Sequence, residues 1–78
     1  MIKLDLSRLS REDLEKAVTE RCSAFGTVLE VIIVQDSTNY NFALAAVEMS
    51  NTTERLALLR QLGDSLSDEA VVIRIEQQ

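Results

Sequence analysis

Apolar and polar residues alternate near both ends of the chain, with two more apolar stretches between them. Apolar side chains occupy every second position from Ile2 to Leu6, which is the period of a half-buried strand. Residues 71–76 follow the same alternation. Residues 28–36 are rich in β-branched side chains, and residues 42–49 are apolar on both sides up to the last two positions. The pattern therefore predicts four strands.

Two segments between these strands have helical periodicity instead. The first begins near Ser10, which with Asp13 resembles a capping box, and ends at Gly26. The second follows Asn51 and ends at Gly63. The residues predicted on the inner face of the first helix are Leu14, Ala17, Val18, Cys22 and Phe25. Those predicted on the inner face of the second helix are Leu56, Leu58, Leu59 and Leu62.

The order of the predicted elements is βαββαβ, with residues 64–69 as a polar connection before the last strand. In this order two helices cover one face of a four-stranded antiparallel sheet, as in ferredoxin-like folds. The chain has 78 residues and no internal linker, which corresponds to one domain spanning residues 1–78. We therefore predict a single α+β domain of the ferredoxin-like class.

Composition narrows the chemistry that the chain can perform. It contains no histidine and one cysteine, Cys22, which lies on an apolar helical face and is expected in the core. No carboxylate pair or phosphate-binding glycine loop has the spacing of a catalytic site, so we expect no enzyme activity, cofactor or metal. No apolar run approaches the ~18 residues that cross a bilayer. With one unpaired thiol, these features favour a soluble cytoplasmic protein that does not bind membranes.

Two strand segments are similar to known ribonucleoprotein motifs: residues 42–49, FALAAVEM, to the longer motif and residues 2–7, IKLDLS, to the shorter one. Through these segments the chain resembles the RNA-recognition-motif family, and the resemblance covers its whole length. The resemblance implies an open sheet face whose aromatic rings stack on single-stranded RNA. This chain instead has Lys3, Leu44 and Ala46 at the ring positions. Because each stacked base contributes about 1 to 3 kcal/mol, and the net charge is -5, we predict RNA binding that is weak at most.

The sheet face opposite the helices is predicted to be apolar at its centre and charged at its rim. Strand alternation directs toward it the side chains of Ile32, Val34, Phe42, Leu44, Ala46 and Val72. The surrounding charged residues are Lys3, Asp5, Glu30, Glu48, Arg74 and Glu76. A polar rim around an apolar centre is typical of protein interfaces. We therefore predict a non-catalytic domain that binds another protein, or a second copy of itself, through this face.

Two other functions remain open from the sequence. One is weak binding of single-stranded RNA through Lys3, Tyr40, Phe42 and Arg74. The other is a ferredoxin-like regulatory module that binds a small metabolite at a dimer interface. The oligomeric state and an RNA titration would distinguish the three functions, and a metabolite ligand would raise the melting temperature of a dimer.

Overall fold

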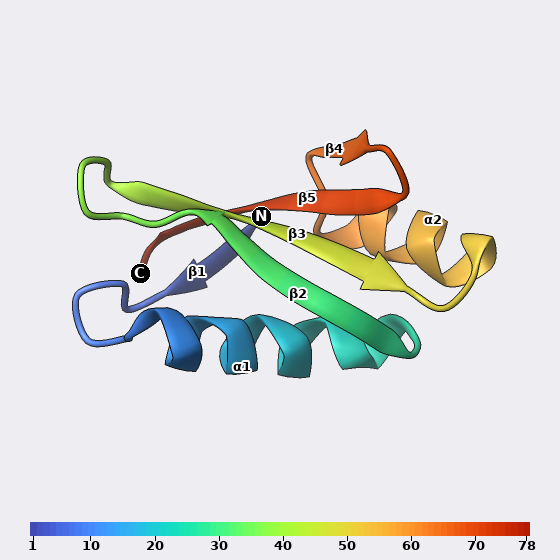
Figure 1. Ribbon diagram of the computed structural model, residues 1–78, viewed down its shortest axis with the longest axis horizontal. Helices are drawn as coiled ribbons and strands as arrows, with labels where there is room; N and C mark the ends of the chain where they lie inside the picture. Colours follow the sequence, from blue (N-terminus) through green and yellow to red (C-terminus); the bar gives the residue numbers. More distant parts are fainter.

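The computed structural model describes residues 1–78 and has an α+β fold with two α-helices and a five-stranded sheet (Figure 1). The predicted fold class is thus confirmed at this level. The elements in chain order are β1 (Ile2–Leu4), α1 (Arg11–Cys22), the 3₁₀-helix η1 (Ser23–Phe25), β2 (Val28–Gln35), β3 (Phe42–Met49), α2 (Thr52–Gln61), β4 (Ser65–Ser67) and β5 (Ala70–Gln77).

The arrangement of the strands differs from the predicted one. Their order in the sheet is β1-β5-β3-β2, and β4 also pairs with β5. β1 runs parallel to β5, with Ile2 opposite Ile75, whereas the other strand pairs are antiparallel. The sheet is therefore mixed and has five strands, so the predicted four-stranded antiparallel, ferredoxin-like arrangement is not confirmed. Side-chain alternation shows which residues share a face, but it does not determine which strands are neighbours.

Residues 64–69 were predicted to be a polar connection, and this prediction is wrong for Ser65–Ser67, which form β4. Ser65 pairs with Val72 and Ser67 pairs with Ala70, so β4 and β5 form a hairpin. Asp68 and Glu69 connect the two strands, and Asp68 has a φ of 56°, a left-handed conformation that aspartate tolerates better than most residues. All three residues of β4 are exposed, which explains why the segment lacks the alternation of a half-buried strand.

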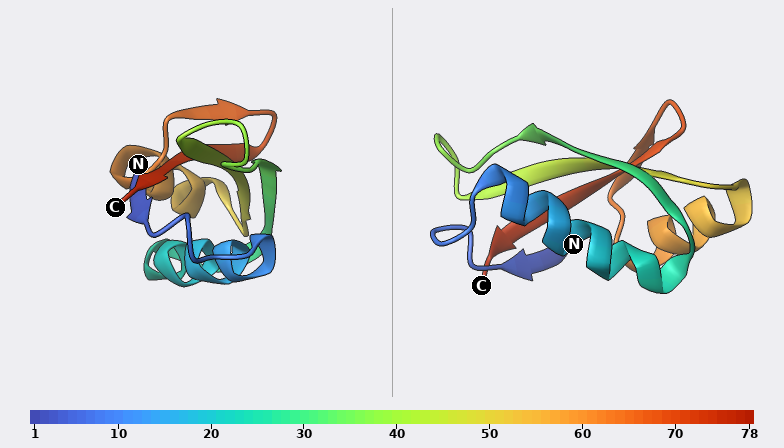
Figure 2. Two further views of the ribbon diagram at one scale, coloured as in Figure 1. Left: turned by 90° about the vertical axis from the view of Figure 1, so that its left-hand side faces the viewer. Right: turned by 60° about the horizontal axis from the view of Figure 1, so that its bottom comes forward.

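The core lies between the helices and one face of the sheet. All 13 buried residues are apolar, and they form one cluster. The two helices contribute Leu14, Val18, Cys22 and Leu58 to it, and the rest come from the strands. Both helices therefore lie against the same face of the sheet. In the left-hand view of Figure 2, α1 lies below the strands and β4 lies above them.

The helix faces follow the predicted pattern with one exception. Leu58 is fully buried, but Leu56 is 39% exposed, so its predicted place on the inner face of α2 is wrong. Residues two positions apart in an α-helix are separated by roughly 200° around the helix axis, so Leu56 and Leu58 cannot both face the sheet. The predicted helix starts are confirmed. Ser10 Oγ accepts from the backbone N–H of Asp13 at 3.1 Å, and Asn51 Oδ1 accepts from that of Glu54 at 2.9 Å.

Glu54 also links the start of α2 to the turn before β2. Its Oε1 accepts hydrogen bonds from Ser50 Oγ at 2.7 Å and from the backbone N–H of Thr27 at 2.8 Å. Both bonds lower the pKa of the Glu54 carboxyl below its ordinary value, and the bond from Ser50 has the larger effect. Gly26 has a φ of 146°, and a Cβ atom there would overlap the Glu54 side chain. The turn therefore requires glycine both for its backbone conformation and for space.

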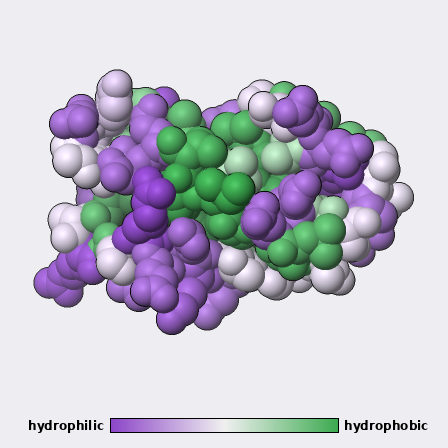
Figure 3. All heavy atoms as spheres, viewed as in Figure 1, coloured by the Kyte–Doolittle hydropathy of each residue, from purple (hydrophilic) through white to green (hydrophobic).

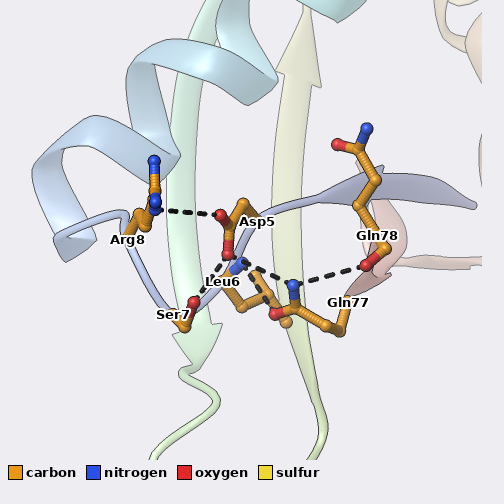
Figure 4. A network of polar contacts seen from close by, with 6 residues as sticks. All are labelled: Asp5, Leu6, Ser7, Arg8, Gln77 and Gln78. Atoms are coloured by element: carbon orange, nitrogen blue, oxygen red, sulfur yellow. Dashed lines mark hydrogen bonds and ion pairs between the residues drawn. The ribbon is translucent and has the colours of Figure 1, made fainter.

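A polar network joins the turn after β1 to the end of β5 (Figure 4). Asp5 Oδ1 accepts from Ser7 Oγ at 2.7 Å and from Gln77 Nε2 at 3.2 Å, and both bonds lower the pKa of the Asp5 carboxyl. The backbone N–H of Leu6 donates to Gln77 Oε1 at 3.0 Å. The parallel pairing of β1 with β5 is thus extended by side-chain hydrogen bonds.

Candidate protein-interaction face

The outer face is defined here as the sheet face that points away from α1 and α2. The six residues predicted on it lie in the adjacent strands β2, β3 and β5. Ala46 lies between Ile32 and Val72, which occupy the same level on the two neighbouring strands. Ile32 is 48% exposed and Val34 is 57% exposed. In Figure 3 apolar atoms gather over the middle of β2 and β3, with hydrophilic atoms on both sides.

One residue of the outer face could not be placed from the sequence. The register between β2 and β3 shifts between Ile33 and Gln35, so Gln35 rather than Val34 is opposite Leu44. Gln35 is half-buried, and its amide nitrogen Nε2 is buried without a hydrogen-bond partner. A β-bulge adds one residue to one strand, and strict alternation does not reveal where this occurs.

A shallow depression of about 510 Å³ lies on the outer face beside the β4–β5 hairpin. Its floor includes Ile32, Ala46 and Val72, and its rim carries the four carboxylates of Glu30, Glu48, Asp68 and Glu69. Glu30 and Glu48 were predicted to point outward. The contribution of Asp68 and Glu69 was not predicted, because it depends on the β4–β5 hairpin, whose turn lies at the start of β5.

None of the four rim carboxylates forms an ion pair within the protein. The ion pairs of the chain are Asp5–Arg8, Arg11–Asp36 and Arg74–Glu76, and none of them includes a rim residue. The rim side chains accept no hydrogen bond either, and all four residues are exposed. Glu30 and Glu48 are directly opposite each other on β2 and β3. Like charges in this position destabilise a sheet.

The other end of the outer face is aromatic and carries a basic residue. The guanidinium carbon of Arg74 lies 3.8 Å from the centre of the Phe42 ring, and the ring of Tyr40 is 5.5 Å from that of Phe42. Arg74 Nε also donates to Glu76 Oε2 at 2.6 Å. Three of the four predicted RNA contacts are therefore together, but Arg74 covers one face of the Phe42 ring.

The remaining predicted contact, Lys3, lies apart from these residues on the edge strand β1. It is opposite Glu76, whose carboxylate is already paired with Arg74. β5 separates β1 from β3, so Lys3 does not neighbour Leu44 or Ala46. The three positions at which the RNA-recognition-motif family has aromatic rings thus form no continuous platform in this sheet.

The chain has a single thiol, at Cys22. Cys22 is fully buried, as predicted, and burial raises the pKa of its thiol to about 11, which disfavours the nucleophilic thiolate. No group of three or more Cys, Asp or Glu side chains is arranged to hold a metal ion. None of the helices has the length and apolar character needed to cross a membrane.

Comparisons of the chain with family models, with curated proteins and with solved structures find no match. The resemblance to the RNA-recognition-motif family therefore stays a prediction. What the outer face binds has to be inferred from its own residues: an aliphatic centre, an acidic depression at one end and a cation–π pair at the other.

Proposed function

We propose that this chain is a non-catalytic protein-interaction domain that binds its partner through the outer face. The observation that carries the proposal is the aliphatic surface across β2, β3 and β5. Ile32 and Val34 are exposed on it, and Leu44, Ala46 and Val72 are half-buried. Soluble proteins rarely expose such a patch unless it contacts another molecule.

The rigidity of the outer face suits this function. An interface of standard size covers about 800 Å² on each partner, roughly one sixth of the 4772 Å² surface of this chain. Burial of apolar surface stabilises a complex by about 25 cal/mol per Å² before the costs of association. Because three hydrogen-bonded strands hold these side chains, little ordering is required when a partner binds.

Position-specific photo-cross-linking tests the proposal in cells that express the chain. A photoreactive phenylalanine analogue at Leu44 is expected to give adducts of defined mass, because this side chain lies at the centre of the outer face. The same analogue at Lys16, an exposed position on α1, serves as the matched control. Adducts at twice the chain mass of 8.7 kDa would identify a second copy as the partner.

Adding Ile32→Asp should abolish the adducts formed from position 44, because it places a charge in the aliphatic centre while the core stays unchanged. Equal adduct patterns from positions 44 and 16, or adducts that persist with Ile32→Asp, would show that the outer face is not the interface.

RNA is expected to bind poorly. We predict no saturable binding tighter than about 10⁻⁴ M at physiological salt, because the chain is acidic and Arg74 already covers the Phe42 ring. Fluorescence anisotropy with a mixed pool of single-stranded RNA would measure this. Sub-micromolar binding that is lost in the Phe42→Ala variant would instead favour an RNA-binding function.

A further inference from the structure

We propose that the acidic end of the outer face binds a lysine- or arginine-rich segment of another protein, with an aliphatic side chain of that segment in the depression. This inference rests on the proposed function and specifies the chemistry of the partner. The depression has an apolar floor of Ile32, Ala46 and Val72, so it can take an aliphatic group. Its rim determines which residues must flank that group.

The rim carries four carboxylates and no basic residue. They come from three separate strands or turns: Glu30 from β2, Glu48 from β3, and Asp68 with Glu69 from the β4–β5 turn. They therefore surround the floor on more than one side. None has an ion pair or a side-chain hydrogen bond within the chain, so each is free to pair with a cation of the partner.

Glu30 and Glu48 supply an independent argument. They are directly opposite each other on one face of an antiparallel pair, where like charges destabilise the sheet and opposite charges stabilise it. A lysine or arginine placed between them would relieve this repulsion. The free protein therefore has an unfavourable interaction that a cationic partner removes, which increases the selectivity of binding for such a partner.

The outer face of a second copy of this chain does not supply the required charge. The basic residues near the other end of the outer face are Lys3 and Arg74, and Arg74 is held by Glu76 and by the ring of Phe42. Pairing the acidic end with that end would set four carboxylates against one unpaired cation. Pairing two acidic ends would bring eight carboxylates together. A heterologous basic segment fits the charges better.

Peptide titration followed by amide chemical shifts of the isotope-labelled full chain tests this inference. The probe is a blocked peptide of sequence Lys-Lys-Val-Leu-Val-Lys-Lys. Two matched peptides separate the contributions: one has glutamate in place of every lysine, and the other has serine in place of the three apolar residues. The basic apolar peptide should shift the amides of Ile32, Ala46 and Val72, and each matched peptide should bind at least roughly tenfold more weakly.

Variants of the rim test the role of the carboxylates. The double variant Glu30→Gln/Glu48→Gln should weaken binding of the basic peptide roughly tenfold, since each exposed ion pair contributes about a factor of three. Glu48→Lys should also weaken binding roughly tenfold and at the same time raise the Tm, because it converts a repulsive cross-strand pair into an attractive one. A variant that is more stable yet binds more weakly excludes unfolding as the cause.

The outcomes distinguish this inference from the proposed function. Equal binding of the basic and acidic apolar peptides on the outer face would contradict charge selection, while protein binding through that face would stand. Shifts confined to α1 or to the free edge of β2 would overturn the proposed site. If no peptide binds and cross-linking at position 44 also fails, both proposals are wrong.

Discussion

A chain carrying Val47→Asp is expected to be unfolded at room temperature. Val47 in β3 is fully buried, and on the neighbouring strands it is opposite Val31 and Val71. The buried core contains no polar or charged residue that could pair with a carboxylate. An unpaired buried charge costs about 4 kcal/mol or more, which is comparable to the whole stability of a small domain. Far-ultraviolet circular dichroism and a thermal melt would measure the loss of structure.

Leu44→Asp is the matched control, since it makes a similar substitution three residues earlier in the same strand. Leu44 is half-buried on the outer face, and Arg74 is opposite it on β5. The introduced carboxylate stays hydrated and can interact with that guanidinium, so the domain should remain folded with a Tm only a few degrees lower. If the two variants lost structure to the same extent, the assignment of the two sheet faces would be wrong.

Gly26→Ala is expected to reduce the free energy of unfolding by about 2 kcal/mol. The φ of 146° at this position is rarely adopted by residues with a side chain, and the added Cβ would overlap the Glu54 side chain. That side chain would have to move, and its hydrogen bonds to Ser50 and to the backbone of Thr27 would be lost. Urea denaturation of both proteins gives the difference.

A double-mutant cycle with Glu54→Ala separates the two causes. When the Glu54 side chain is absent, Gly26→Ala should cost less, because the overlap is gone and only the backbone strain remains. The same cost in both backgrounds would contradict the close packing of Glu54 against Gly26.

The sequence was sufficient to predict which residues face the core along β3 and the middle of β2, but not at the two register shifts of β2. The period-2 pattern places Ala43, Ala45 and Val47 inward and Glu30 and Ile32 outward, and the structure agrees. The caps of both helices were also predictable, because Ser10 and Asn51 act on residues three positions away. These features depend on local chemistry, which a sequence records directly.

The neighbours of each strand could not be predicted in the same way. β1 has three residues, and nothing in Ile2–Leu4 indicates that its partner is β5 or that the pairing is parallel. The acidic depression depends on this kind of long-range information. Glu30 and Glu48 were predicted to point outward. That they lie around one depression with Asp68 and Glu69 follows from the register of β2 with β3 and from the β4–β5 hairpin.

The place of β5 in the sheet has a consequence for synthesis on the ribosome. β5 is the last strand along the chain, yet β1, β3 and β4 all pair with it. A nascent chain that has been translated only as far as Glu69 therefore has no partner for β1 or β4, and one edge of β3 is open. Open strand edges are prone to aggregation. We expect the nascent chain to gain protease resistance only after β5 has left the exit tunnel.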